Sequence, residues 1–168
     1  KNPKKIIVIE KDMFLAEKLK KIYGDKINII NEDILKIDEN KFNHEKIIVL
    51  GNLPYNISTQ ILAKWIKIKN LNKLFKSLIL MFQKEVAERI VAHTNSKNYG
   101  RLSILTNWKM NVKKIQEISP NCFYPAPKVR STILTFEPKK KFFKLNNPDT
   151  LEKITNVFFN QRRKMIKN

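Results

Sequence analysis

The chain has 168 residues, of which 42% are hydrophobic, and its 34 Lys and Arg against 15 Asp and Glu give a formal net charge of +19. This length allows one domain and part of a second, and no apolar run is long enough to cross a membrane. The charge predicts a polyanionic partner, with nucleic acid favoured, although a coding bias toward Lys, Asn and Ile gives the same composition without selection for binding. A single cysteine, Cys122, excludes an internal disulfide and indicates a reducing, cytoplasmic setting.

Two strands are expected near the N-terminus, each ending in a carboxylate. The apolar, β-branched run at 6–9 predicts a central parallel strand that ends at Glu10, and Asp12 then has the position of a helix N-cap. A second strand over 27–30 leads to Asp33. Carboxylates at such strand ends often accept hydrogen bonds from ribose, although Glu10 alone is also typical of a solvated loop and Asp33 of a turn or cap.

The most informative stretch follows the apolar run at 47–50 and precedes an amphipathic helix. There the Asn52 side-chain oxygen and the Leu53 carbonyl can converge on the two hydrogens of an exocyclic amine. Pro54 fixes the turn, and Tyr55 offers a ring face on which a base can stack. These groups suit an adenine amino group that is to be alkylated.

Three polar strand ends are therefore expected at one edge of a parallel sheet. Glu10, Asp33 and Asn52 each follow an apolar strand, and the carboxyl ends of parallel strands are where open α/β sheets place ligands. The three together indicate a ligand site better than any one alone. No metal is predicted there, because His44 and His93 each lack a second ligand at metal spacing.

Beyond this stretch, the hydrophobic pattern predicts further helices and strands. Helices are expected from Ser58, over 84–90 and over 102–108, and strands over 78–82, 112–118 and 131–136.

The loop at 120–131 is the second informative segment. Three prolines hold it extended, so that Phe123 and Tyr124 can close over a flat ligand while Lys128 and Arg130 touch phosphates. The competing interpretation is a proline-rich connector whose aromatic residues fill the core.

A domain boundary is predicted after residue 138, within a proline- and lysine-rich segment. Residues 1–138 then form the main domain, and residues 139–168 begin a helical C-terminal domain. Its helix starts at Pro148 and leads into a basic patch made of Arg162, Arg163 and Lys164.

Taken together, these motifs resemble the rRNA adenine N6,N6-dimethyltransferase family, and within it the bacterial small-subunit enzymes linked to kasugamycin sensitivity. A lone Asn-Leu-Pro-Tyr motif is a moderate signal, whereas an ordered set of motifs along nearly the whole chain is a strong one. The matching segments are 8–12 (VIEKD), 33–35 (DIL), 51–58 (GNLPYNIS), 82–89 (FQKEVAER), 99–103 (YGRLS), 123–131 (FYPAPKVRS) and 159–164 (FNQRRK).

The resemblance implies a Rossmann-like α/β methyltransferase sheet with the start of a small helical RNA-binding domain. It implies S-adenosylmethionine as methyl donor, with Glu10 at its ribose, Asp33 at its adenine amino group and Asn52 near both cofactor and target amine. Tyr55 and Phe123 would stack on the two faces of a flipped adenine. The residues expected to contact RNA are Arg101, Lys128, Arg130, Arg162, Arg163 and Lys164.

The implied activity is dimethylation of two adjacent adenosines near the 3′ end of small-subunit rRNA, by a cytoplasmic monomer acting on the small-subunit precursor in ribosome biogenesis. Two alternatives stay open: a large-subunit adenine methyltransferase of the antibiotic-resistance type, and a non-catalytic nucleic-acid-binding or assembly factor on the same fold. The segment at 159–164 favours the small-subunit branch.

One departure from the family is expected to matter. The family opens with a glycine-rich cofactor loop on its first strand, and the three glycines here, Gly24, Gly51 and Gly100, form no such loop. We therefore expect a fragment that lacks the family's first strand, which would pair with the strand at 6–9 on one side and the strand at 47–50 on the other. By itself, such a fragment should have little affinity for S-adenosylmethionine.

Overall fold

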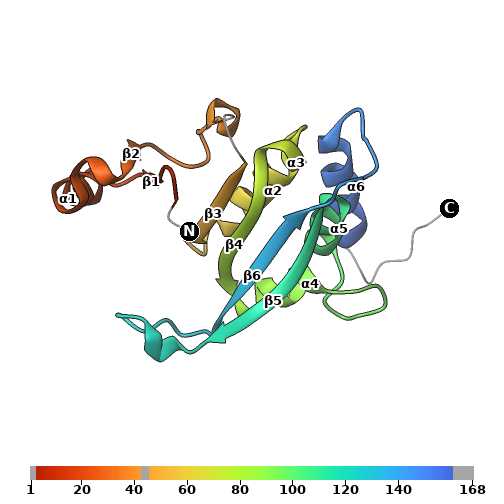
Figure 1. The fold of residues 1–168 in the computed structure, drawn as a ribbon. Coiled ribbons are helices and arrows are strands. Elements are labelled where there is room, and N and C mark those ends of the chain that lie inside the picture. Colours follow the sequence, from red (N-terminus) through yellow and green to blue (C-terminus); the bar gives the residue numbers. More distant parts are fainter. Residues whose placement is uncertain (1–2, 43–45, 161–168) are drawn as a thin grey trace. The chain divides into compact units, whose positions relative to one another are not determined.

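The computed structural model describes residues 3–42 and 46–160, and the chain divides into two compact units, residues 1–41 and 42–168 (Figure 1). The first unit holds β1 (Ile7–Glu10), α1 (Met13–Tyr23) and β2 (Asn28–Asn31), with a 3₁₀ turn at Gly24–Lys26 and a second one at Glu39–Phe42 that reaches the boundary. The second unit holds β3 (Ile47–Asn52), α2 (Ser58–Lys67), α3 (Leu71–Leu74), β4 (Phe75–Gln83), α4 (Lys84–Val91), α5 (Arg101–Lys109), β5 (Met110–Ile118), β6 (Ser131–Pro138) and α6 (Pro148–Asn160).

In the first unit, β1 and β2 form a parallel pair in which Glu10 lies opposite Asn31. The predicted cap of α1 is confirmed, since the Asp12 side chain accepts a hydrogen bond from the Leu15 amide at 3.0 Å. The helix ends at Gly24, whose φ of 55° lies in the left-handed region that favours glycine.

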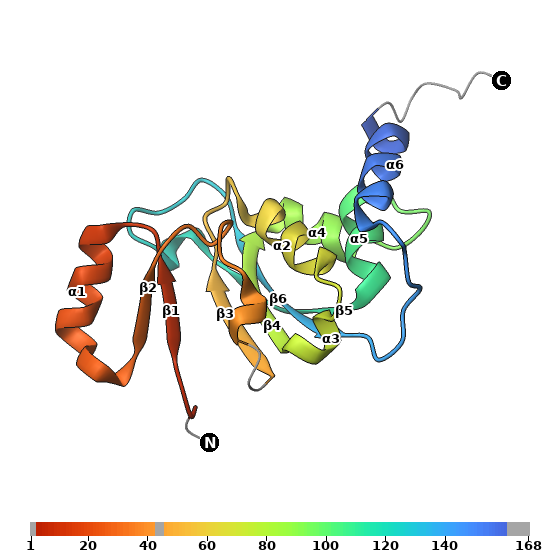
Figure 2. The same cartoon turned by 90° about the horizontal axis from the view of Figure 1, so that it is seen from above.

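The second unit is built on a four-stranded sheet in the order β3-β4-β6-β5. Strands β3 and β4 are parallel, while β6 runs antiparallel to both β4 and β5. Helices α2, α4 and α5 cover one face of this sheet (Figure 2). The α2 stripe is buried against it as expected, through the side chains of Ile61, Leu62, Trp65 and Ile66.

The prediction of a central strand at 6–9 needs a correction. Strand β1 pairs with β2 alone among the described residues, and the chain has two sheets in place of one. A central strand needs a hydrogen-bonded neighbour at each edge, and within the described residues β1 and β3 each have one.

The chain thus has an α/β fold with a mixed sheet. The strand expected over 131–136 continues to Pro138, and α6 begins at the predicted Pro148 and packs against α5 in the second unit. The two compact units divide at residue 41, and the residues on both sides of 138 belong to the second unit. The domain boundary expected after residue 138 stays a prediction. Among the described helices, none has the length and apolar character needed to span a membrane.

Candidate functional site

Three parts of the chain hold the candidate site residues, and the first of them, within the first unit, is formed by the carboxyl ends of β1 and β2. Glu10 ends β1, and its Oε1 accepts a hydrogen bond from the Asp12 amide at 2.8 Å. The Asn31 side chain donates to the main-chain oxygens of Glu10, at 2.9 Å, and Lys11, at 3.1 Å, which ties the two strand ends together. One Glu10 carboxylate oxygen is thereby held in place by the backbone, which orients the other.

Asp33 lies at the same edge and is already engaged. Its Oδ2 accepts a hydrogen bond from Lys11 Nζ at 2.9 Å, and its Oδ1 accepts one from the Leu35 amide at 2.9 Å. The hydrogen bond from Lys11 lowers the pKa of Asp33 below its ordinary value, with the Leu35 amide adding to the effect, so the carboxylate is ionised at neutral pH. The structure therefore brings Glu10 and Asp33 to one edge of the two-stranded sheet, whereas Asn52, the third residue expected at this edge, ends a strand of the other sheet, so the prediction of one shared edge is wrong for Asn52.

The second part, within the second unit, is the loop that follows β3. Asn52, the last residue of the strand, is exposed, and no hydrogen bond to its side chain is present within the described residues. Gly51 allows the chain to fold back closely, because a Cβ there would stand 2.9 Å from the side chains of both Leu53 and Leu80. The Leu53 side chain therefore packs close against the end of the strand.

The loop is held at its far end by Tyr55. The Tyr55 hydroxyl lies 2.6 Å from Ser131 Oγ, at the start of β6, and the Tyr55 carbonyl accepts a bond from Ser58 Oγ at 3.1 Å. The Pro54 carbonyl accepts one from the Ile57 amide at 3.2 Å, whereas no described residue donates to the Leu53 carbonyl. Asn52 and Leu53 are thus left with acceptors available to a ligand, on a loop fixed at both ends.

The third part is the segment between β5 and β6, which projects beyond the end of the sheet (Figure 1). This segment begins after Ile118 of β5 and ends before Ser131 of β6, and these two residues pair across the two strands. Phe123 is half-buried and Tyr124 is fully exposed. The interpretation that its aromatic residues fill the core is therefore wrong for Tyr124.

A family model for ribosomal RNA adenine dimethylases matches residues 1–168. The chain belongs to the ribosomal RNA adenine dimethylase family. It is 58% identical over 167 residues to ribosomal RNA small subunit methyltransferase A of Pelagibacter ubique (strain HTCC1062), a match that covers 99% of this chain and 64% of that relative. It is 46% identical over 173 residues to the protein of the same name from Ehrlichia ruminantium (strain Gardel), covering 100% and 64%. The chain thus spans 64% of the length of these relatives.

Two solved structures share the fold of this dimethylase family member. A dimethyladenosine transferase from Plasmodium falciparum has a TM-score of 0.80 at 32% identity, covering 97% of this chain and 58% of that one. The 23S rRNA methyltransferase ErmE has a TM-score of 0.70 at 20% identity, covering 95% and 63%, and this likeness shows the fold alone. The family resemblance carried by the sequence motifs is confirmed.

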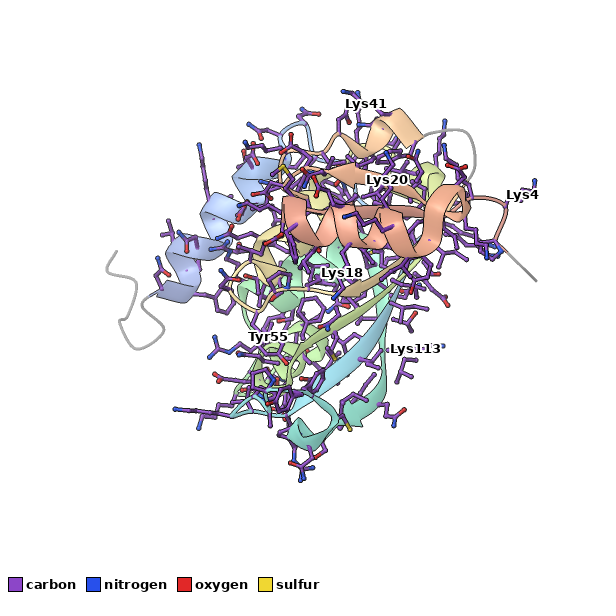
Figure 3. The ribbon with its side chains drawn as sticks, turned by 90° about the vertical axis from the view of Figure 1, so that its left-hand side faces the viewer. Lys4, Lys18, Lys20, Lys41, Tyr55 and Lys113 are labelled. Atoms are coloured by element: carbon purple, nitrogen blue, oxygen red, sulfur yellow. The ribbon has the colours of Figure 1, made fainter. Side chains whose placement is uncertain are left out.

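The basic residues predicted to contact RNA have different surroundings in this chain. Lys128 and Arg130 are exposed on the projecting loop. Arg101 instead donates to Glu152 at 2.7 Å and to Asn156 at 3.3 Å. Arg162, Arg163 and Lys164 lie outside the described residues, as does His44. Other lysines also project into the solvent, among them Lys113 on β5 (Figure 3).

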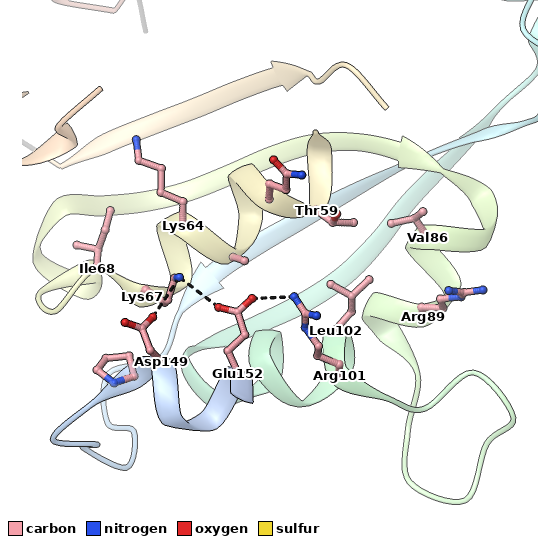
Figure 4. Close-up of a pocket in the computed structure, with 13 residues that line it drawn as sticks. Thr59, Lys64, Lys67, Ile68, Val86, Arg89, Arg101, Leu102, Asp149 and Glu152 are labelled. Atoms are coloured by element: carbon pink, nitrogen blue, oxygen red, sulfur yellow. Dashed lines mark hydrogen bonds and ion pairs between the residues drawn. The ribbon is translucent and has the colours of Figure 1, made fainter. Parts of the chain in front are cut away.

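Sequence reasoning missed a charged groove in the second unit. It has a volume of about 890 Å³ and lies between α2, α4, α5 and the start of α6 (Figure 4). Lys67 of α2 lies 3.2 Å from both Asp149 and Glu152 of α6, and Glu152 also binds Arg101 of α5. No local signal could have revealed these pairs, because Lys67 and Glu152 are 85 residues apart in the sequence.

Proposed function

We propose that this chain carries the catalytic region of an enzyme that dimethylates N6 of two adjacent adenosines near the 3′ end of small-subunit rRNA, with S-adenosylmethionine as donor. The small-subunit methyltransferase names of its relatives support this substrate. The observation that carries the proposal is the loop after β3, where Asn52 and Leu53 present unengaged acceptors while Tyr55 is anchored to Ser131.

In this proposal the loop binds and orients the target amine. The Asn52 side-chain oxygen and the Leu53 carbonyl accept hydrogen bonds from its two N–H groups, which draws the nitrogen lone pair out of conjugation with the ring and toward the methyl donor. Tyr55 stacks on one face of the flipped adenine and Phe123 on the other, and Pro54 holds the turn. The bond to Ser131 fixes the Tyr55 ring before the base arrives, so that less entropy is lost on binding.

No strong general base is needed for this reaction. The amine becomes acidic once it is methylated, and it can lose a proton to water. The rate then depends on alignment and on the polar groups that replace water around the developing charge. This matches a loop whose available groups are acceptors and ring faces.

The carboxylates of the first unit fit the proposed donor in part. S-adenosylmethionine, when bound, supplies an electrophilic methyl group. Glu10 keeps one carboxylate oxygen available for a ribose hydroxyl, and we assign it that role. Asp33, assigned to the adenine amino group, accepts hydrogen bonds from Lys11 and Leu35, so a ligand there has to share its oxygens with Lys11.

RNA contacts are proposed on the projecting loop and the C-terminal helical segment. Lys128 and Arg130 are exposed and close in sequence to Phe123. Arg162, Arg163 and Lys164 complete the proposed set, in a helical RNA-binding domain that begins at residue 139. A contact from Arg101 stays a prediction, because its guanidinium binds Glu152 and Asn156. We also propose a cytoplasmic monomer that acts on the small-subunit precursor.

Substitution of Asn52 tests this function. In the intact protein, Asn52→Ala should abolish methyl transfer to under-methylated small subunits and leave RNA affinity unchanged, because only the acceptor for the target amine is lost. Methylation is measured with radiolabelled S-adenosylmethionine, and binding by filter retention. Asn111→Ala is the matched control and should keep full activity. It removes an exposed side-chain amide near the start of β5, at the end of that strand away from the projecting loop.

Three other outcomes would each overturn one part of the proposed function. Normal methylation by Asn52→Ala would refute the assignment of the site. Methylation of large subunits in place of small ones by the unsubstituted protein would overturn the substrate. RNA binding without any methyl transfer would replace the enzyme with a non-catalytic factor.

A further inference from the structure

A cluster of charges lies at the base of the projecting loop. Glu117, near the end of β5, accepts from Lys84 Nζ at 3.2 Å and from Lys114, and Arg130 Nη1 lies 3.9 Å from its Oε2. We call these four residues the Glu117 cluster. Three positive charges face one negative charge, which leaves an excess of two.

The backbone brings these side chains together. The Lys84 amide, at the start of α4, donates to the Arg130 carbonyl at 2.9 Å, which joins the end of β4 to the start of β6. Glu117 pairs with Thr132 on the other side of β6. The cluster therefore spans three neighbouring strand ends and does not depend on one flexible loop.

A β-bulge explains why Lys114 belongs to the cluster. Residues three apart on a regular strand point to opposite faces of the sheet. The register of β5 against β6 shifts between Lys114 and Gln116, and one extra residue there returns Lys114 to the face of Glu117. Lys113 is then left on the other face, projecting into solvent (Figure 3).

The cluster adjoins the proposed catalytic loop. Arg130 directly precedes Ser131, whose hydroxyl lies 2.6 Å from that of Tyr55. The same loop that carries Phe123 and Tyr124 returns to the sheet at Arg130. An RNA strand that places a base between Tyr55 and Phe123 therefore has its phosphates near these cations.

We propose that Lys84, Lys114 and Arg130 form a seat for the backbone phosphate of the nucleotide next to the target adenosine. The proposal rests on the proposed function and deepens it by giving the substrate strand a contact point. Arg130 offers a planar fork that suits phosphate, and the two lysines offer point charges. Glu117 holds the three cations at one place before RNA binds.

Electrostatics favours this role over a purely structural one. Hydrogen bonds from Lys114 and Lys84 hold the pKa of Glu117 below its ordinary value, so the carboxylate is charged at neutral pH and can balance one cation only. The mutual repulsion of the cations is left partly uncompensated. A phosphate group would relieve that repulsion, and it would release counterions from the RNA.

Removal of single lysines tests the seat. The probe is a fluorescently labelled single-stranded RNA that contains two adjacent adenosines, and its Kd is measured by anisotropy at several salt concentrations. Lys84→Gln and Lys114→Gln should each weaken binding roughly three- to tenfold and reduce the slope of log K against log salt by about 0.7. The matched controls are Lys76→Gln, on β4, and Lys113→Gln, beside Lys114; both should bind within about twofold of the unsubstituted chain.

Glu117→Gln separates a phosphate seat from a structural cluster. It removes the one negative charge but keeps a side-chain oxygen that can accept from the two lysines, so the seat predicts tighter RNA binding, whereas a structural role predicts unchanged or weaker binding. Equal effects at Lys84, Lys76 and Lys113 would overturn the seat and leave only diffuse attraction. If the seat fails, methyl transfer by the unsubstituted protein still stands; if the proposed function fails, methyl transfer is absent whatever the affinities.

Discussion

Two charged regions of the second unit differ in their balance. In the groove, an ion-pair network joins Lys67 and Arg101 to Asp149 and Glu152, and within this network positive and negative charges are equal in number. In the Glu117 cluster, three cations share one carboxylate. The groove joins α6 to α2 and α5, whereas the Glu117 cluster stands at the base of an exposed loop.

The difference shows how one very basic chain uses its cations in two ways. A balanced network of ion pairs between separate helices holds those helices together and leaves little field for a polyanion. An unbalanced cluster adds less to stability, because repulsion among its cations offsets part of their attraction to the one carboxylate, but it keeps an attraction for phosphate. The net charge of +19 therefore indicates less about where RNA binds than a local excess of positive over negative side chains does.

The largest effect on stability is expected in the groove. Glu152→Ala removes the carboxylate shared by Lys67 and Arg101 and should lower the free energy of unfolding by about 1.5 kcal/mol. Denaturant titration followed by circular dichroism measures it. Glu117→Ala is the matched variant and should cost clearly less. A larger loss at Glu117 than at Glu152 would reverse the comparison.

A smaller loss is expected at the anchor of the catalytic loop. The hydrogen bond between the Tyr55 and Ser131 hydroxyls, two uncharged groups, holds the loop after β3 in place. Tyr55→Phe should lower the free energy of unfolding by about 1 kcal/mol and reduce kcat for methyl transfer more than it raises KM.

Ser131→Ala is the partner variant in a double-mutant cycle for this anchor. The two losses should be non-additive, because both variants remove the same hydrogen bond. Fully additive losses would show that the bond does not form in solution.

Local features of the fold could be predicted from the sequence, while contacts between distant residues could not. The Asp12 cap, the buried stripe of α2 and the helix from Pro148 follow from residue type and spacing within one or two turns. The four-residue helix α3 was missed, since so short an element gives no periodic signal.

The candidate site shows the same limit. The acceptors of Asn52 and Leu53 could be located because they follow an apolar strand directly. The Tyr55–Ser131 bond joins residues 76 apart, and the bulge beside Lys114 appeared in the sequence only as an imperfect alternation. Whether a cation has a carboxylate partner depends on contacts between residues that are far apart in the sequence. Composition alone therefore could not separate the groove from the Glu117 cluster.

Lys109 extends the comparison to a cation that forms no ion pair with a carboxylate in the described part of the chain. Its side chain is 2% exposed, its Nζ donates to the Ile68 carbonyl at 3.0 Å, and it lies 4.2 Å from the centroid of the Trp108 ring. Burial lowers the pKa of Lys109 from its ordinary value of 10.5 to about 8. The cation–π contact and one carbonyl only partly replace its hydration.

The last expected effect is a change of stability with pH at this lysine. The folded chain releases the Lys109 proton near pH 8, whereas the unfolded chain keeps it up to its ordinary pKa of 10.5. Between these values the unfolded state binds more protons, so a rise in pH favours the folded state. Relative to Lys109→Met, the free energy of unfolding of the unsubstituted chain should therefore rise from about pH 8 to about pH 9. Because the other lysines titrate equally in both proteins, a constant difference would show that Lys109 keeps its proton in the fold.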